Sequence, residues 1–145
     1  MTTSRSKIIV ELISAFFIFL FAYTAISKVL EIRLFKITLS KSPLIGNLAG
    51  ISAWTIILLE LSAVLFLLFP PLRIKGLLLS VLLMATFTVY IAIMLLISSD
   101  LPCSCGGVFT SLSWRDHLYL NIILTALAAT GLLVHKKNNT LVKLV

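Results

Sequence analysis

Four long apolar runs constrain most strongly what this chain can fold into. Each is close to the roughly 20 residues that a helix needs to cross about 30 Å of hydrocarbon. Transmembrane barrels instead show alternating segments of about ten residues. We therefore predict an all-α membrane protein, a four-transmembrane-helix bundle that forms a single domain over residues 1–145. The predicted spans cover about residues 8–26, 48–69, 77–97 and 114–134.

The composition agrees with this interpretation. Apolar residues make up 60% of the chain and charged residues 12%, against about a quarter charged in average globular domains. Arg5 and Lys7 precede the first run, as in a signal peptide, but no small-x-small cleavage site stands out before Lys28. We therefore expect the first run to remain as an uncleaved helix.

The distribution of basic residues predicts the orientation of the bundle. Four crossings place both termini on one side, together with the second loop. Seven of the twelve basic residues then lie on that side. The second loop contains Arg73 and Lys75, whereas the third contains only Arg115. By the positive-inside rule we expect both termini in the cytoplasm and the third loop outside, where disulfide chemistry is permitted.

The net charge of +7 does not predict nucleic-acid binding. No basic stripe interleaved with stacking aromatic residues is present, and basic residues that flank apolar helices meet anionic lipid headgroups. We expect membrane lipid, and no nucleic acid, as a partner of these residues.

The third loop holds the only two cysteines of the chain, Cys103 and Cys105, followed by two glycines. A disulfide between cysteines two residues apart closes a small ring that constrains the bridge torsion. Strained bridges are more often labile or catalytic than structural. The spacing therefore predicts thiol–disulfide exchange, with Cys103 and Cys105 as catalytic residues and Cys105 as the attacking sulfur; an incidental pair is the alternative.

Residues just after this loop are candidate supporting groups. Arg115 or His117 would favour the thiolate through positive charge. Two thiolates with His117 would also suit Cu(I) or zinc, but the twelve-residue gap matches no standard zinc finger, and we assign no metal ligand. Trp114 fits an interfacial aromatic belt.

Glu60 lies in the middle of the second run, roughly 18 Å deep at about 1.5 Å per residue. A carboxyl group there is costly and must face the bundle interior. We expect Lys28 to lie too far away for a direct bond unless the first helix tilts strongly. Threonines are expected to be better placed, namely Thr86, Thr88 and Thr125. Glu60 would relay protons, bind a polar head such as a quinone carbonyl, or make a buried structural hydrogen bond.

The first loop alternates charged and apolar residues over positions 28–39. This pattern is typical of an amphipathic helix in the membrane interface. Such a helix would either cap the outer end of the bundle, close to the cysteine loop, or serve only as a surface anchor.

Several short motifs occur in a fixed order, namely residues 23–28, residues 39–44, Glu60, residues 103–107, Trp114 and residues 117–118. Together they resemble the MauE/DoxX-like redox-associated membrane proteins, most closely their Bacteroidetes-type members. The resemblance implies a bacterial inner-membrane protein that accompanies thioredoxin-like periplasmic proteins. The founding member is associated with methylamine dehydrogenase maturation, which requires periplasmic disulfides. Related quinone-linked thiol oxidases carry two cysteine pairs, whereas this chain carries one.

These observations lead to one principal hypothesis, an inner-membrane thiol–disulfide exchange protein that serves a periplasmic thioredoxin-like partner. Whether it is an enzyme, a thiol-disulfide oxidoreductase, stays open, and a quinone is a candidate cofactor. One alternative is a non-catalytic small subunit of a cell-envelope complex, because small residues in the fourth helix allow close helix contacts. The other is copper or zinc handling. The predicted supporting residues are Glu60, His117, Arg115, Trp114 and Lys28; the small residues are Thr125, Ala126, Ala128, Ala129 and Gly131.

Overall fold

The computed structural model describes residues 2–42, 45–97 and 114–143, and their side chains except those of residues 2–4, 114 and 138–143. These described residues form helices and no strand. Four helices are long and apolar enough to cross a membrane, which confirms the predicted all-α membrane bundle. The elements are α1 (Thr2–Leu30), α2 (Ile32–Ser40), η1 (Gly46–Leu48), α3 (Ala49–Leu68), η2 (Pro70–Leu72), α4 (Arg73–Ile97) and α5 (Trp114–Lys143).

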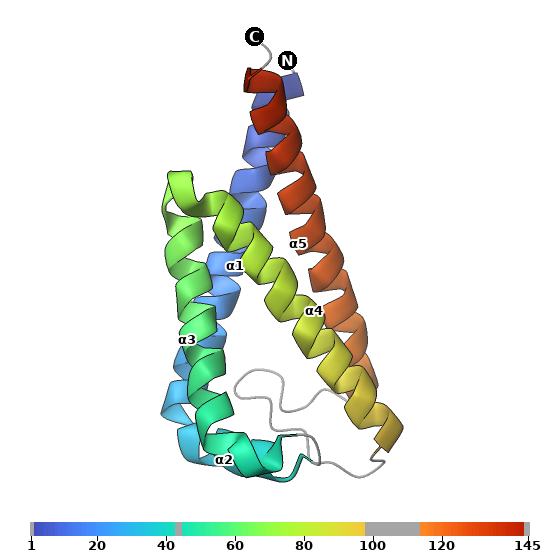
Figure 1. Ribbon diagram of the computed structural model, residues 1–145. Helices are drawn as coiled ribbons and strands as arrows, with labels where there is room; N and C mark the ends of the chain where they lie inside the picture. Colours follow the sequence, from blue (N-terminus) through green and yellow to red (C-terminus); the bar gives the residue numbers. More distant parts are fainter. Residues whose placement is uncertain (1, 43–44, 98–113, 144–145) are drawn as a thin grey trace.

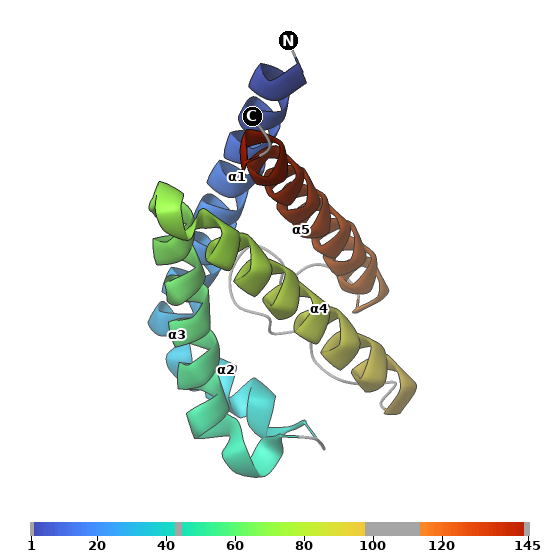
Figure 2. The same ribbon diagram turned by 45° about the horizontal axis from the view of Figure 1, so that its top comes forward.

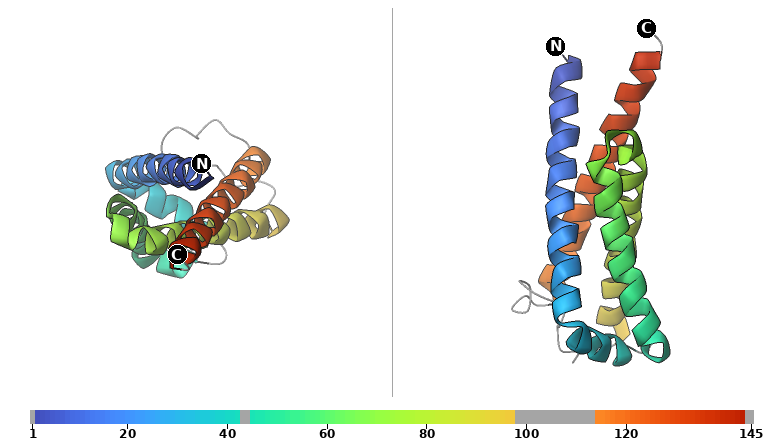
Figure 3. Two further views of the ribbon diagram at one scale, coloured as in Figure 1. Left: turned by 90° about the horizontal axis from the view of Figure 1, so that it is seen from above. Right: turned by 90° about the vertical axis from the view of Figure 1, so that its left-hand side faces the viewer.

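The four long helices form a ring in which each packs mainly against two others. α1 contacts α3 and α5, and α4 contacts the same two helices. The N- and C-terminal ends lie together at one end of the bundle, and α2 lies across the other end (Figure 1). The view along the bundle in Figure 3 shows α1 and α4 on opposite sides of the ring.

The connection between α3 and α4 is tight because of two consecutive prolines. Phe69 precedes Pro70 and takes an extended conformation, with φ −91° and ψ 115°, since a residue before proline disfavours the helical region. The helical turn η2 follows and leads directly into α4. From this turn α3 and α4 diverge toward the end where α2 lies (Figures 1 and 2).

The helices pack through stripes of buried residues at spacings of three and four. A charged residue occupies one position in each of two stripes, Lys28 in α1 and Glu60 in α3. These spacings follow the helical period, so both charged side chains face neighbouring helices. The stripe in α1 contains Val10, Ile13, Phe17, Phe21, Ala25 and Lys28, and that in α3 contains Ala49, Ala53, Ile57, Glu60, Ala63 and Leu67.

α2 is the amphipathic helix of the first loop. It buries Phe35 and Leu39 against Ala49 and Ala53 at the start of α3, while residues of its opposite face remain exposed. Just after it, the Ser42 hydroxyl lies 3.6 Å from the sulfur of Met94 near the end of α4. α2 therefore covers one end of the bundle and is packed against it.

Gly76 allows a close approach of α4 to α3, and it provides a test of this packing. A Cβ atom there would lie 2.8 Å from the backbone nitrogen of Leu67, which cannot move aside as a side chain does. We expect Gly76→Ala to lower the free energy of unfolding by about 1–3 kcal/mol, as overpacking does. Gly50 has nothing within 4 Å of such a Cβ atom, and Gly50→Ala is the matched control. It should leave stability unchanged or raise it by up to about 1 kcal/mol. Denaturant titration in detergent measures both, and equal effects would contradict the close contact.

Candidate functional site

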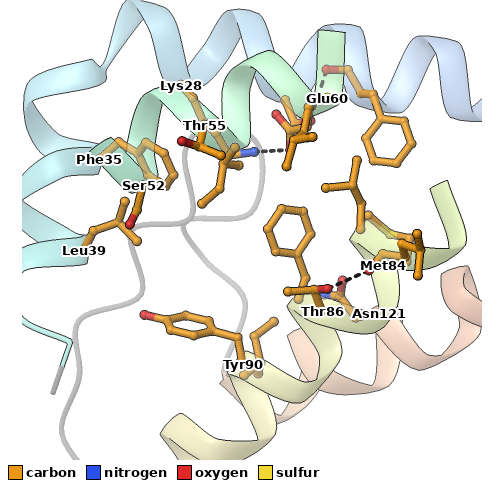
Figure 4. A pocket seen from close by; sticks show the side chains of 18 of the residues that line it. Lys28, Phe35, Leu39, Ser52, Thr55, Glu60, Met84, Thr86, Tyr90 and Asn121 are labelled. Atoms are coloured by element: carbon orange, nitrogen blue, oxygen red, sulfur yellow. Dashed lines mark hydrogen bonds and ion pairs between the residues drawn. The ribbon is translucent and has the colours of Figure 1, made fainter. Parts of the chain in front are cut away.

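The centre of the candidate site is an ion pair between α1 and α3. The Lys28 ammonium nitrogen lies 2.6 Å from Glu60 Oε1, and the two side chains are only 10% and 1% exposed. Figure 4 shows the two side chains pointing toward each other from different helices. Charges inside a membrane protein are expensive unless they are paired, so each residue accounts for the presence of the other.

The expectation that Lys28 lies too far from Glu60 is wrong, and side-chain direction explains the error. Side chains on a helix lean toward its N-terminus. Because α1 and α3 run in opposite directions, Lys28 leans back toward the middle of the bundle and Glu60 leans toward the end where α2 lies. The two side chains therefore converge.

The threonines that were expected to be better placed have other partners. The hydroxyls of Thr88 and Thr125 lie 3.2 Å apart and link α4 to α5. The Thr86 hydroxyl donates to the carbonyl oxygen of Leu82 in its own helix, at 2.8 Å. The partner of Glu60 is therefore Lys28, and the three threonines are satisfied elsewhere.

The ion pair retains unused hydrogen-bonding capacity. Glu60 Oε2 is buried and has no hydrogen-bond partner among the described residues. The Thr24 hydroxyl also interacts with this carboxyl group, and its single proton is donated to the carbonyl oxygen of Phe21, 3.3 Å away. An ammonium group has three donors, and Lys28 uses one of them for Glu60. Its nitrogen also lies 5.7 Å from the ring centroids of both Phe35 and Phe87, in a cation–π geometry.

A cavity of about 630 Å³ lies directly beside the pair. All five α-helices contribute to its lining, which is mostly apolar. The Lys28–Glu60 pair comes from α1 and α3, whereas Tyr90 and Asn121 come from α4 and α5 (Figure 4). The polar lining residues are Thr24, Lys28, Thr38, Ser52, Thr55, Glu60, Thr86, Tyr90, His117 and Asn121.

Two of the helices that line the cavity, α3 and α4, diverge toward the end of the bundle where α2 lies (Figure 1). The cavity lining includes Ile51 from α3 and Leu82 from α4, and these side chains are 70% and 56% exposed. In a membrane, exposed apolar side chains on transmembrane helices contact lipid. The cavity lining therefore includes side chains that lie on the outer surface of these two helices.

The structure brings three of the predicted site residues together. Lys28, Glu60 and His117 all line the cavity, and His117 is half-buried in the first turn of α5. Arg115 is exposed and is not part of the lining. The side chain of Trp114, and Cys103 and Cys105 entirely, lie outside the described residues, so the predicted exchange loop stays a prediction.

Other cavity residues were not predicted from the sequence. Phe87, Tyr90 and Asn121 contribute to the lining, and Asn121 is buried, donating to the backbone oxygen of His117 at 2.9 Å. An asparagine within an apolar run is a signal that the sequence offered. Phe87 gives no such signal, because aromatic residues of these helices also occupy exposed positions, as Phe19 does.

Residues that bear on the two alternative functions also have defined positions. Thr125 contacts α4, and a Cβ atom on Gly131 would lie 2.9 Å from Ile13 of α1. These small residues therefore serve packing within this chain. Within the part of the chain that the structure describes, no group of three or more His, Cys, Asp or Glu residues is placed to hold a metal ion.

Comparison with known proteins gives one match. A family model described as "Methylamine utilisation protein MauE" matches residues 6–134, and this range includes Lys28, Glu60 and both cysteines. No curated protein and no solved structure matches the chain.

Proposed function

The chain belongs to the MauE family of membrane proteins, and from this premise we propose that it is a thiol–disulfide exchange protein of the bacterial inner membrane. The observation that carries the proposal is the position of its only two cysteines along the chain. Cys103 and Cys105 lie between Ile97, where α4 ends, and Trp114, where α5 begins. Both helix ends lie at the end of the bundle remote from the termini (Figure 1).

We propose that this end faces the periplasm and that both termini are cytoplasmic. The excess of basic residues on the side of the termini supports this orientation. The partner would be a periplasmic protein of the thioredoxin-like class, which itself carries a reactive cysteine pair. An oxidising compartment allows both proteins to cycle between dithiol and disulfide.

The reaction we propose moves two electrons and passes through one covalent intermediate. The thiolate of Cys105 attacks the disulfide of the partner, forms a mixed disulfide and releases one partner cysteine as a thiolate. Cys103 then attacks the sulfur of Cys105 and releases the second partner cysteine. The partner leaves as a dithiol, and Cys103 and Cys105 are left as a disulfide; the reverse reaction uses the same intermediate.

Two features near the start of α5 favour the thiolate that this reaction needs. Arg115 is exposed in the first turn of the helix, close to the cysteines in sequence. The N-terminal end of α5 also carries the positive end of the helix dipole. Positive charge near a cysteine lowers the free energy of its thiolate form.

A single-cysteine variant tests the proposal directly. We expect Cys103→Ser to accumulate a mixed disulfide through Cys105 with a periplasmic protein, because the resolving sulfur is missing. Non-reducing electrophoresis and mass spectrometry of the isolated band would identify the adduct, and a reductant should cleave it. The cysteine-free double variant should form none.

A matched control separates exchange from incidental thiol reactivity. In the cysteine-free background, Ser104→Cys places one thiol between the two native positions. It should trap the partner at least tenfold less than Cys105 alone. Equal trapping by Ser104→Cys, or a partner whose redox state does not change when both cysteines are removed, would rule the proposal out.

A further inference from the structure

We propose that the cavity beside Lys28 and Glu60 is a binding site for a lipid-soluble quinone or quinol that enters between α3 and α4. This inference goes beyond thiol–disulfide exchange and is independent of it, because every residue that supports it lies in the helices. It rests on three properties of the cavity: its unused polar atoms, its charge balance and the exposed apolar side chains in its lining.

The unused polar atoms fit both redox forms of such a ligand. A quinone carbonyl oxygen accepts a hydrogen bond, and the Lys28 ammonium has two N–H groups without an acceptor among the described residues. A quinol hydroxyl donates a hydrogen bond, and the buried Glu60 Oε2 has no donor among those residues. Because an unsatisfied buried oxygen destabilises a protein, a hydroxyl that satisfies it gains binding free energy.

The charges of the cavity lining favour a ligand whose polar group is neutral. Lys28 and Glu60 are oppositely charged members of the described lining, and at 2.6 Å they neutralise each other. A phosphate or carboxylate head would face Glu60 without a free cation to balance it. A ligand with neutral carbonyl or hydroxyl groups meets no such repulsion.

The size and lining of the cavity fit a ring with an apolar tail. Its volume of about 630 Å³ is within the range of roughly 300–1,000 Å³ that is usual for small-molecule sites. Phe21 and Phe87 provide aromatic surface in the lining, and Tyr90 and Asn121 add polar groups from α4 and α5. Ile51 and Leu82 line the cavity and are also exposed on the outer surface of α3 and α4, so they would contact a tail that extends into the bilayer.

The test is a binding titration with decylubiquinone. The full-length protein is placed in lipid nanodiscs, and quenching of tryptophan fluorescence is followed as the quinone is added. We expect saturable quenching by the wild-type protein. The double variant Lys28→Met with Glu60→Met removes both charges together, so that no unpaired charge is left to unfold the protein, and it should bind at least tenfold more weakly.

A second pair of variants tests the entrance without touching the charges. Thr86 is an exposed lining residue of α4, and Thr86→Phe should narrow the opening and weaken binding at least tenfold. Thr130 is also exposed, lies outside the lining, and makes the same bond to a carbonyl oxygen one turn earlier, at 2.8 Å. Thr130→Phe is therefore the matched control and should bind like the wild-type protein.

Three results would overturn the inference. They are quenching that does not saturate, a folded double variant that binds as tightly as the wild type, and displacement of the quinone by decanol at equal concentration. The last would indicate a groove for any apolar chain. The cysteine-free variant should bind decylubiquinone unchanged, so a failure of the exchange proposal and a failure of quinone binding are distinguishable.

Discussion

Replacing Lys28 with methionine should lower the free energy of unfolding by about 3–5 kcal/mol. The substitution leaves the Glu60 carboxyl group, 1% exposed, without its cation, and removing one partner of a buried ion pair is strongly destabilising. Titration with a denaturing detergent, followed by circular dichroism, measures the change. Lys41→Met, at an exposed position after α2, is the control for loss of a lysine and should change stability by less than about 0.5 kcal/mol.

A double variant distinguishes the contribution of the ion pair from the effect of removing one side chain. Adding Glu60→Met to Lys28→Met should restore stability to within about 1 kcal/mol of the wild type, since apolar residues of similar volume often replace a buried pair without loss. The two substitutions would then show a coupling energy of at least about 2 kcal/mol. If the double variant were as unstable as Lys28→Met, the loss of stability in Lys28→Met would not result from leaving Glu60 without its partner.

If the pair can be replaced without loss of stability, its presence requires another reason. Two apolar side chains would fill the same positions in the buried stripes of α1 and α3. Polar residues inside membrane bundles mark binding sites and transport pathways. The expected result therefore supports a binding role for Lys28 and Glu60 rather than a purely structural one.

The helices of this fold could be predicted from the sequence because the bilayer dictates their length and composition. Which face of each helix is buried could not be predicted from the sequence. In a soluble protein, polar residues mark the exposed side of a helix, but here exposed positions such as Leu12 and Phe19 are as apolar as the buried Phe17. The charged residues mark the inner face more clearly than the apolar ones do: Lys28 lies three and seven residues after the buried Ala25 and Phe21.

The candidate site was only half predictable for a related reason. Glu60 was recognisable because a carboxyl group in an apolar run is costly. Lys28 is among the predicted supporting residues, but its direct bond to Glu60 is not expected when depth is counted along the helices, because that count ignores how side chains of antiparallel helices lean toward each other. The cavity was not predictable at all, since it depends on the divergence of α3 and α4 beyond the two prolines.

The packing of α2 leads to the last prediction, because this helix covers the end of the bundle that contains the site. Phe35 is 7% exposed and packs against the start of α3, and its ring also lies 5.7 Å from the Lys28 nitrogen. Phe35→Ala removes both contacts and should lower stability by about 3–5 kcal/mol, as such truncations in cores do. Phe35 and Leu39 are the two buried residues of α2, so we expect the loss of stability to be confined to the packing of α2 on the bundle.

Hydrogen exchange followed by mass spectrometry distinguishes this local effect from general unfolding. Phe35→Ala should speed exchange of the amides in α2 at least tenfold while α4 and α5 stay protected. Leu34 is the neighbouring residue and is 57% exposed, so Leu34→Ala should leave exchange in α2 within twofold of the wild type. Equal exchange in the two variants would mean that Phe35 does not anchor α2. Faster exchange confined to α2 would instead show that the Phe35 side chain holds α2 in place over the end of the bundle that contains the Lys28–Glu60 pair.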